Sequence, residues 1–186
     1  MSIVNALTSI PGWQVYTWIV GIGVPAAIHL RAARPRNRSR RSEIVLMYVL
    51  GVSGAIGMFN FVMHTVFAQD VAASIGWPAG SPFQTEVGFA NLAIGLIGFA
   101  CFWRYEFWLP ALTAKSVFAF GAGVTHVLDM FQTGNFAPNN AGPILAWDFL
   151  LPVVMITLYV LARPARHRVA VKPHQYWSTR WRLEAE

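Results

Sequence analysis

The chain has 186 residues, of which 55% are hydrophobic and only 12% are charged. Soluble domains average about 25% charged residues, so a water-soluble enzyme is not expected. A disordered chain is excluded more firmly, because disordered chains are poor in apolar residues. The single cysteine, Cys101, excludes a disulfide scaffold and a cysteine-based zinc cage. Long uncharged runs instead favour a multi-pass membrane protein.

Five apolar runs are each close to the roughly 20 residues that a helix needs to cross the hydrocarbon core. They predict an all-α fold, an integral membrane bundle of five transmembrane helices in one domain over residues 1–162. A basic cytoplasmic tail is expected over 163–186. The expected spans cover about 11–30, 44–67, 82–103, 108–131 and 143–162.

The positive charge is gathered on one side of the expected membrane. If the N-terminus is outside, all fourteen Lys and Arg residues fall on the cytoplasmic half. This asymmetry predicts an outside N-terminus and a cytoplasmic C-terminus. It also favours the lipid bilayer, and not nucleic acid, as the partner of the basic clusters. The first cytoplasmic loop carries Arg31, Arg34, Arg36, Arg38, Arg40 and Arg41.

Small and polar residues at helical spacing indicate the faces by which the spans pack. The third span carries such a stripe of Gly88, Asn91, Gly95 and Gly98. Interhelical amide hydrogen bonds are common in membrane bundles, so three residues are expected to be supporting polar groups: Asn60, Gln84 and Asn91. Lys115, about two turns into the fourth span, is expected to extend to the inner interface.

Two imidazoles and three carboxylates lie in one layer, within roughly 10 Å of the outer ends of four spans. They are His64, Glu86, His126, Asp129 and Asp148. An ionisable group at the centre of a span costs about 2.5–3.5 kcal/mol. No Lys or Arg is expected on the outer side, so imidazolium, protons, water or a bound cation must offset the carboxylates. Because imidazole and carboxylate suit transition metals, the pattern predicts a site for zinc, iron or copper.

Two other interpretations of this layer stay open. Water at the interface could solvate several of these groups, and Glu86 and Asp148 lie near helix N-termini, where the helix dipole favours negative charge. A haem held by His64 and His126 as axial ligands is a further alternative, but it leaves the three carboxylates unexplained.

Three segments carry a resemblance to a known family. They are GSPFQTEVGFANLAIG (80–95), GVTHVLDM (123–130) and NNAGPILAWDFLLPV (139–153). Together they resemble a bacterial family of uncharacterised small multi-pass integral membrane proteins. The resemblance implies a location in the bacterial cell inner membrane and no known activity. The bundle is also loosely similar in kind to DoxX-like proteins, which are associated with quinol oxidation, without a shared motif.

Three functions follow as hypotheses. The first is a metalloprotein that acts in redox, lipid or quinone chemistry at the outer layer. The second is a non-catalytic subunit or assembly partner of a larger membrane complex, or a homo-oligomer. The third is a small proton- or cation-coupled transporter, which would need a polar relay in the inner half that a single copy of the sequence does not supply. Whether the protein is an enzyme is left open.

Overall fold

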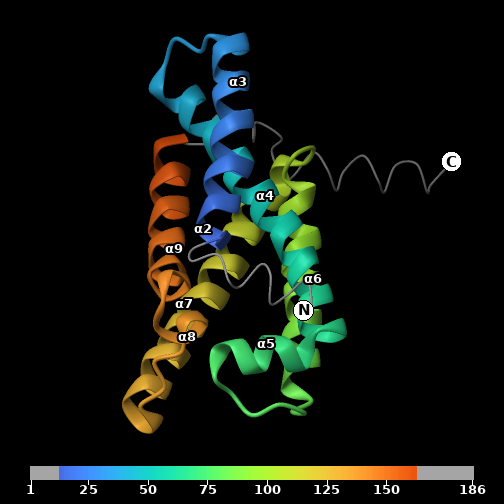
Figure 1. Ribbon diagram of the computed structural model, residues 1–186. Coiled ribbons are helices and arrows are strands. Elements are labelled where there is room, and N and C mark those ends of the chain that lie inside the picture. Colours follow the sequence, from blue (N-terminus) through green and yellow to red (C-terminus); the bar gives the residue numbers. More distant parts are fainter. Residues whose placement is uncertain (1–12, 163–186) are drawn as a thin grey trace, which may run out of the picture.

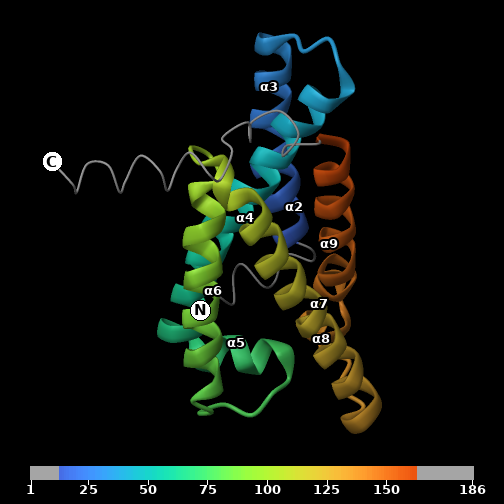
Figure 2. The same cartoon turned by 180° about the vertical axis from the view of Figure 1, so that it is seen from behind.

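The computed structural model describes residues 13–162, and the expected tail over 163–186 lies outside them. Figures 1 and 2 show long helices side by side, with a short helix across one end. The elements are α2 (Trp13–Trp18), η1 (Ile19–Gly23), α3 (Val24–Ala33), α4 (Arg38–Val66), α5 (Ala68–Ile75), α6 (Phe83–Ala100), η2 (Tyr105–Phe107), α7 (Trp108–Thr133), α8 (Pro138–Ala141) and α9 (Pro143–Ala162). The described residues form no strand, which confirms the all-α expectation.

Within residues 13–162, four helical segments are long and apolar enough to cross a membrane: Arg38–Val66, Phe83–Ala100, Tyr105–Thr133 and Pro138–Ala162. The first expected span, over about 11–30, is built from α2, η1 and α3, which follow one another along the chain. Because its middle turn is a π-helix, none of its three pieces is long enough by itself to cross a membrane.

The outside of the bundle is apolar, as lipid-facing surfaces are. Phe131 is 85% exposed and Trp103 is 70% exposed. By contrast, Leu46 and Met155 are completely buried in a core cluster between α4, α7 and α9. Large aromatic and aliphatic side chains thus cover the exterior, while the helix interfaces contain a compact core.

The α4–α6 interface is the closest helix contact, and small residues make it possible. A Cβ added to Gly54 would lie 2.1 Å from the backbone nitrogen of Phe99. One added to Gly98 would lie 2.9 Å from the Cα of Gly54. Asn91 and Gly95 are buried on the same face of α6. The stripe that the sequence predicted on the third span is therefore the packing face.

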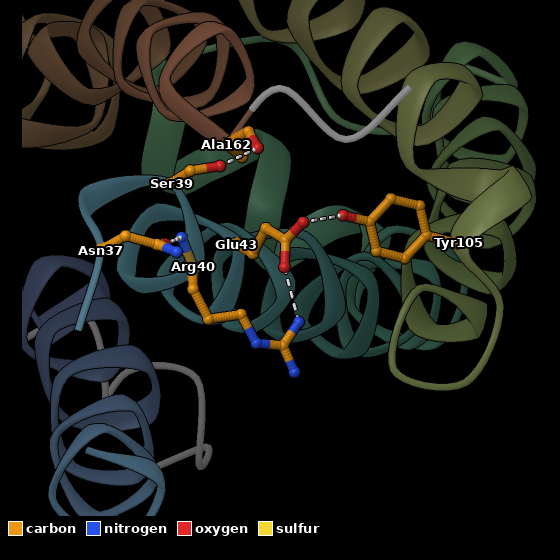
Figure 3. A network of polar contacts seen from close by, with 6 residues as sticks. All are labelled: Asn37, Ser39, Arg40, Glu43, Tyr105 and Ala162. Carbon is orange, nitrogen blue, oxygen red and sulfur yellow. Dashed lines mark hydrogen bonds and ion pairs between the residues drawn. The ribbon is translucent and has the colours of Figure 1, made fainter. Parts of the chain in front are cut away.

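The end of the bundle that holds the α3–α4 turn and η2 is called the arginine end. Here α4 begins at Arg38, well before the expected start at Ile44, because the side chain of Asn37 caps it and accepts a hydrogen bond from the backbone N–H of Arg40 (2.8 Å). Figure 3 shows the contacts that follow. Ser39 Oγ donates to the carbonyl of Ala162 (2.6 Å), which joins α4 to α9.

Glu43 extends the same network toward η2. It pairs with Arg40 on its own helix (2.5 Å) and accepts a hydrogen bond from the hydroxyl of Tyr105 (2.9 Å) (Figure 3). The Tyr105 ring stacks on Trp108, with the ring centroids 4.0 Å apart. These contacts fix the start of α7 against the start of α4.

Candidate functional site

At the opposite end of the bundle, polar side chains converge on Asp129, near the end of α7. Its Oδ2 atom accepts hydrogen bonds from Trp77 Nε1 (2.9 Å), Asn135 Nδ2 (2.7 Å) and Asn140 Nδ2 (3.0 Å). Thr133 Oγ1 donates to its Oδ1 atom (3.2 Å). We call this network, together with His126, the clasp. It joins α7 to α8 and to the segment after α5.

His126, the imidazole of the clasp, lies one turn before Asp129 on α7, and it is buried. Its Nδ1 atom is 2.6 Å from Asn140 Oδ1. Its ring stacks on Trp77, with the centroids 5.6 Å apart and an interplanar angle of 25°. The imidazole is therefore held by an amide at one edge and by an indole on one face.

The local sequence explains why Trp77 reaches the clasp. α5 ends at Ile75, and Gly76, the next residue, has a left-handed backbone (φ 84°). The N–H of Trp77 bonds back to the carbonyl of Ala72 (2.9 Å). A Cβ on Gly76 would also lie 2.5 Å from Asn135 Oδ1. Asn135 in turn donates to the carbonyl of Ile75 (2.8 Å). Glycine thus permits both the turn and the contact with the loop before α8.

The second expected imidazole belongs to a separate pair. His64 Nδ1, near the end of α4, is 2.7 Å from Oε1 of the buried Gln84 at the start of α6. Glu86, two residues further along α6, is exposed. Within residues 13–162, no group of three or more His, Cys, Asp or Glu side chains could hold a metal ion. The expected five-residue metal site is not assembled there, and metal binding stays a prediction.

The three residues expected to be supporting polar groups do not share one site either. Gln84 holds His64, as described above. Asn91 is buried and bonds within its own helix, to the carbonyl of Val87 (3.0 Å). Asn60 is partly buried. The six arginines of the α3–α4 region are all exposed at the arginine end.

Asp148 is a partly buried residue of α9 that lies close to α7. A Cβ on Gly123 would be 3.2 Å from the Cβ of Asp148. The Lys115 ammonium, two helical turns from Gly123 on α7, lies close enough to attract the Asp148 carboxylate electrostatically. Lys115 lines a narrow interior space together with Ser53 of α4 and Met155 of α9. We call Lys115 and Asp148 the buried charge pair.

The position of Lys115 corrects the sequence interpretation, which placed its ammonium at the inner interface. α7 turns this residue toward α4 and α9, and its Nζ atom lies 5.6 Å from the centroid of the Phe118 ring. The residues next to the charge pair also carry unmatched polar atoms. Ser116 Oγ and Trp147 Nε1 are buried with no hydrogen-bond partner among the described residues. The sequence placed Lys115 about two turns into the fourth span, but did not show which neighbouring helices surround it.

These features define the class of the protein: the part of the chain that the structure describes is all-helical, with four helices suited to crossing a membrane and polar groups between the helices. The model of a family of unknown function (DUF6790) matches residues 12–168, so the chain belongs to that family. No curated protein and no solved structure matches the chain.

Proposed function

We propose that the protein handles protons or small cations within a membrane, through the buried charge pair of Lys115 and Asp148. The observation that carries the proposal is the position of these two charges between helices that are suited to crossing a membrane. A charged side chain at such depth is costly, and proteins that retain one generally use it in a proton relay or an ion pathway.

The geometry of the pair suits reversible binding. The salt bridges among the described residues are Arg40–Glu43 and Arg104–Glu106, so Lys115 and Asp148 attract one another over a longer distance. The Asp148 carboxylate is therefore stabilised by the ammonium without being tied to it by a hydrogen bond. Uptake of a proton or cation by Asp148 would cancel its charge and weaken the attraction between α7 and α9.

The test is proton or cation uptake into proteoliposomes. Purified protein is reconstituted with an internal pH-sensitive dye, and a potassium diffusion potential provides the driving force. Asp148→Asn is expected to abolish the dye response, and Asp148→Glu to restore part of it. The matched control is Glu106→Gln, because this exposed carboxylate pairs with Arg104 at the arginine end. Equal uptake by wild type and Asp148→Asn would contradict the proposal.

We also propose the finer topology: five spans in a bacterial inner membrane, with the N-terminus outside and the arginine end in the cytoplasm. The distribution of Lys and Arg supports it, and the exposed arginines are placed to meet anionic head groups. In a Cys101→Ala background, Ala79→Cys should react with an impermeant maleimide in intact cells. Arg36→Cys should react only after permeabilisation. The reverse pattern would overturn the orientation.

The metalloprotein and complex-subunit hypotheses predict different results. A metalloprotein should retain one or two equivalents of a transition metal after purification in mild detergent and lose them in His126→Ala. A subunit of a larger complex should co-purify with fixed partners and tolerate Asp148→Asn. Neither outcome is expected if the buried charge pair carries the function.

A further inference from the structure

Pro152 interrupts the backbone hydrogen bonding of α9. It lies inside the helix and is buried, as are Leu151 and Met155. Proline has no backbone N–H, so it cannot donate the helical hydrogen bond to the carbonyl four residues earlier. That carbonyl belongs to Asp148. Because lipid offers no replacement donor, a carbonyl freed in a membrane helix needs another polar partner.

The freed carbonyl and the carboxylate belong to the same residue, so the chain itself keeps their oxygen atoms close together. Oxygen atoms of carboxylates and main-chain carbonyls are the ligands that hard cations prefer. Interrupted membrane helices use freed carbonyls in this way to coordinate Na⁺. We propose that Asp148 binds a monovalent alkali cation, for which Na⁺ is the probe, through its carboxylate and its main-chain carbonyl. The inference rests on the proposed function and names the cation that the buried charge pair handles.

The charges of the pair favour a monovalent cation. Lys115 and Asp148 attract one another, and together they are neutral. A monovalent cation at Asp148 leaves one uncompensated positive charge, whereas a divalent cation leaves two, at a depth where charge is costly. A transition metal would also need more protein ligands. Within residues 13–162, no group of three or more His, Cys, Asp or Glu side chains provides them.

Polar atoms next to the pair in sequence fit a cation that keeps part of its water shell. Ser116, directly after Lys115, and Trp147, directly before Asp148, each carry a buried polar atom with no hydrogen-bond partner among the described residues. Such atoms are rare, because buried polar groups normally bond to protein or to ordered water. Water that enters with the cation supplies partners of this kind on α7 and α9.

Lys115 makes the binding reversible. The salt bridges among the described residues do not include it, so its ammonium repels a cation at Asp148 without covering the oxygen atoms. Lys115→Gln removes this repulsion and keeps a polar side chain. It should therefore bind Na⁺ more tightly than wild type does, whereas weaker binding by the folded variant would contradict the proposal.

The first test is equilibrium binding of radioactive Na⁺ to purified protein in detergent, with choline chloride as the only other salt. Wild type is expected to retain Na⁺, and Asp148→Asn to retain none. Pro152→Ala returns an N–H donor to the Asp148 carbonyl. It should weaken binding by about tenfold or more, in line with the loss of one contact to a charged group. Pro143→Ala is the matched control, because a proline at the first position of α9 frees no carbonyl.

A second substitution separates the loss of a ligand from damage to the helix. Pro152→Gly supplies the same N–H, but glycine has a lower helix propensity than alanine. Both variants should lose Na⁺ binding although their unfolding temperatures differ. Wild-type affinity in either folded variant would overturn the inference. Absence of Na⁺ binding by the wild type would overturn it without any variant.

The proteoliposome assay distinguishes this inference from the proposed function. Proton uptake that Asp148→Asn abolishes, together with no binding of Na⁺ by the wild type, would overturn the alkali-cation site and leave the proposed function intact. Wild-type uptake by Asp148→Asn would instead refute the proposed function itself.

Discussion

Replacing Gly54 by alanine should force the two most closely packed helices apart. The added Cβ would lie 2.1 Å from the backbone nitrogen of Phe99, and also within 2.6 Å of backbone atoms of Gly95 and Gly98. Ordinary van der Waals contact begins at 3.4 Å, so α4 and α6 must move apart until the new Cβ is at least that far from the Phe99 nitrogen. Because the obstructing atoms belong to helix backbone, no side-chain rotation can relieve the clash.

The expected loss of stability follows from two opposing terms. Overpacking a close interface costs about 1–3 kcal/mol and sometimes more, and a clash with backbone lies at the upper end. Alanine has a higher helix propensity than glycine, which stabilises the folded state by about 1 kcal/mol. The net destabilisation is about 2 kcal/mol, which corresponds to a fall in unfolding temperature of roughly 4–8 °C for a chain of this size.

The assay is thermal unfolding of purified protein in one detergent, followed by circular dichroism. Gly121→Ala is the matched control: this glycine is also inside a helix, but a Cβ there meets nothing within 4 Å. Its unfolding temperature should stay the same or rise slightly. If Gly54→Ala proved as stable as Gly121→Ala, the close α4–α6 packing described above would be wrong.

Two further substitutions test the ends of the bundle by the same assay. Gly76→Ala should destabilise more than Gly80→Ala: both glycines have positive φ, of 84° and 87°, but only Gly76 would bring its Cβ against Asn135. The difference measures the clasp contact, and equal losses would show that backbone strain alone matters. Tyr105→Phe removes one hydrogen bond to Glu43 and should cost about 0.5–1.5 kcal/mol; an unchanged unfolding temperature would show that this bond adds nothing.

The candidate site was predictable only in part. The sequence placed His126 and Asp129 on neighbouring turns of one helix, because a spacing of three fixes that relation. Their partners were not predictable. Trp77 donates to Asp129 across 52 residues, and the segments that bring Asn135 and Asn140 to the same carboxylate are loops and one short helix. These segments carry no periodic pattern that shows where they fold back.

The same limit explains the five-residue layer. Similar depth along separate helices does not set the rotation of each helix about its own axis. α6 turns Glu86 outward and Gln84 inward toward His64. His126 instead contacts Asn140 and Trp77, so the two imidazoles belong to separate groups of residues.

Composition and periodicity by themselves determined that the chain is all-helical, that its long helices are suited to a membrane, and that small residues line the packing face of α6. These are properties of single helices, set by residue type and by the 3.6-residue turn. Only the tertiary structure decided that Lys115 and Asp148, on separate helices, attract one another and that Asn140 meets His126 in the clasp. Such pairings depend on how separate helices are rotated and brought together, and that is decided by packing over the whole bundle.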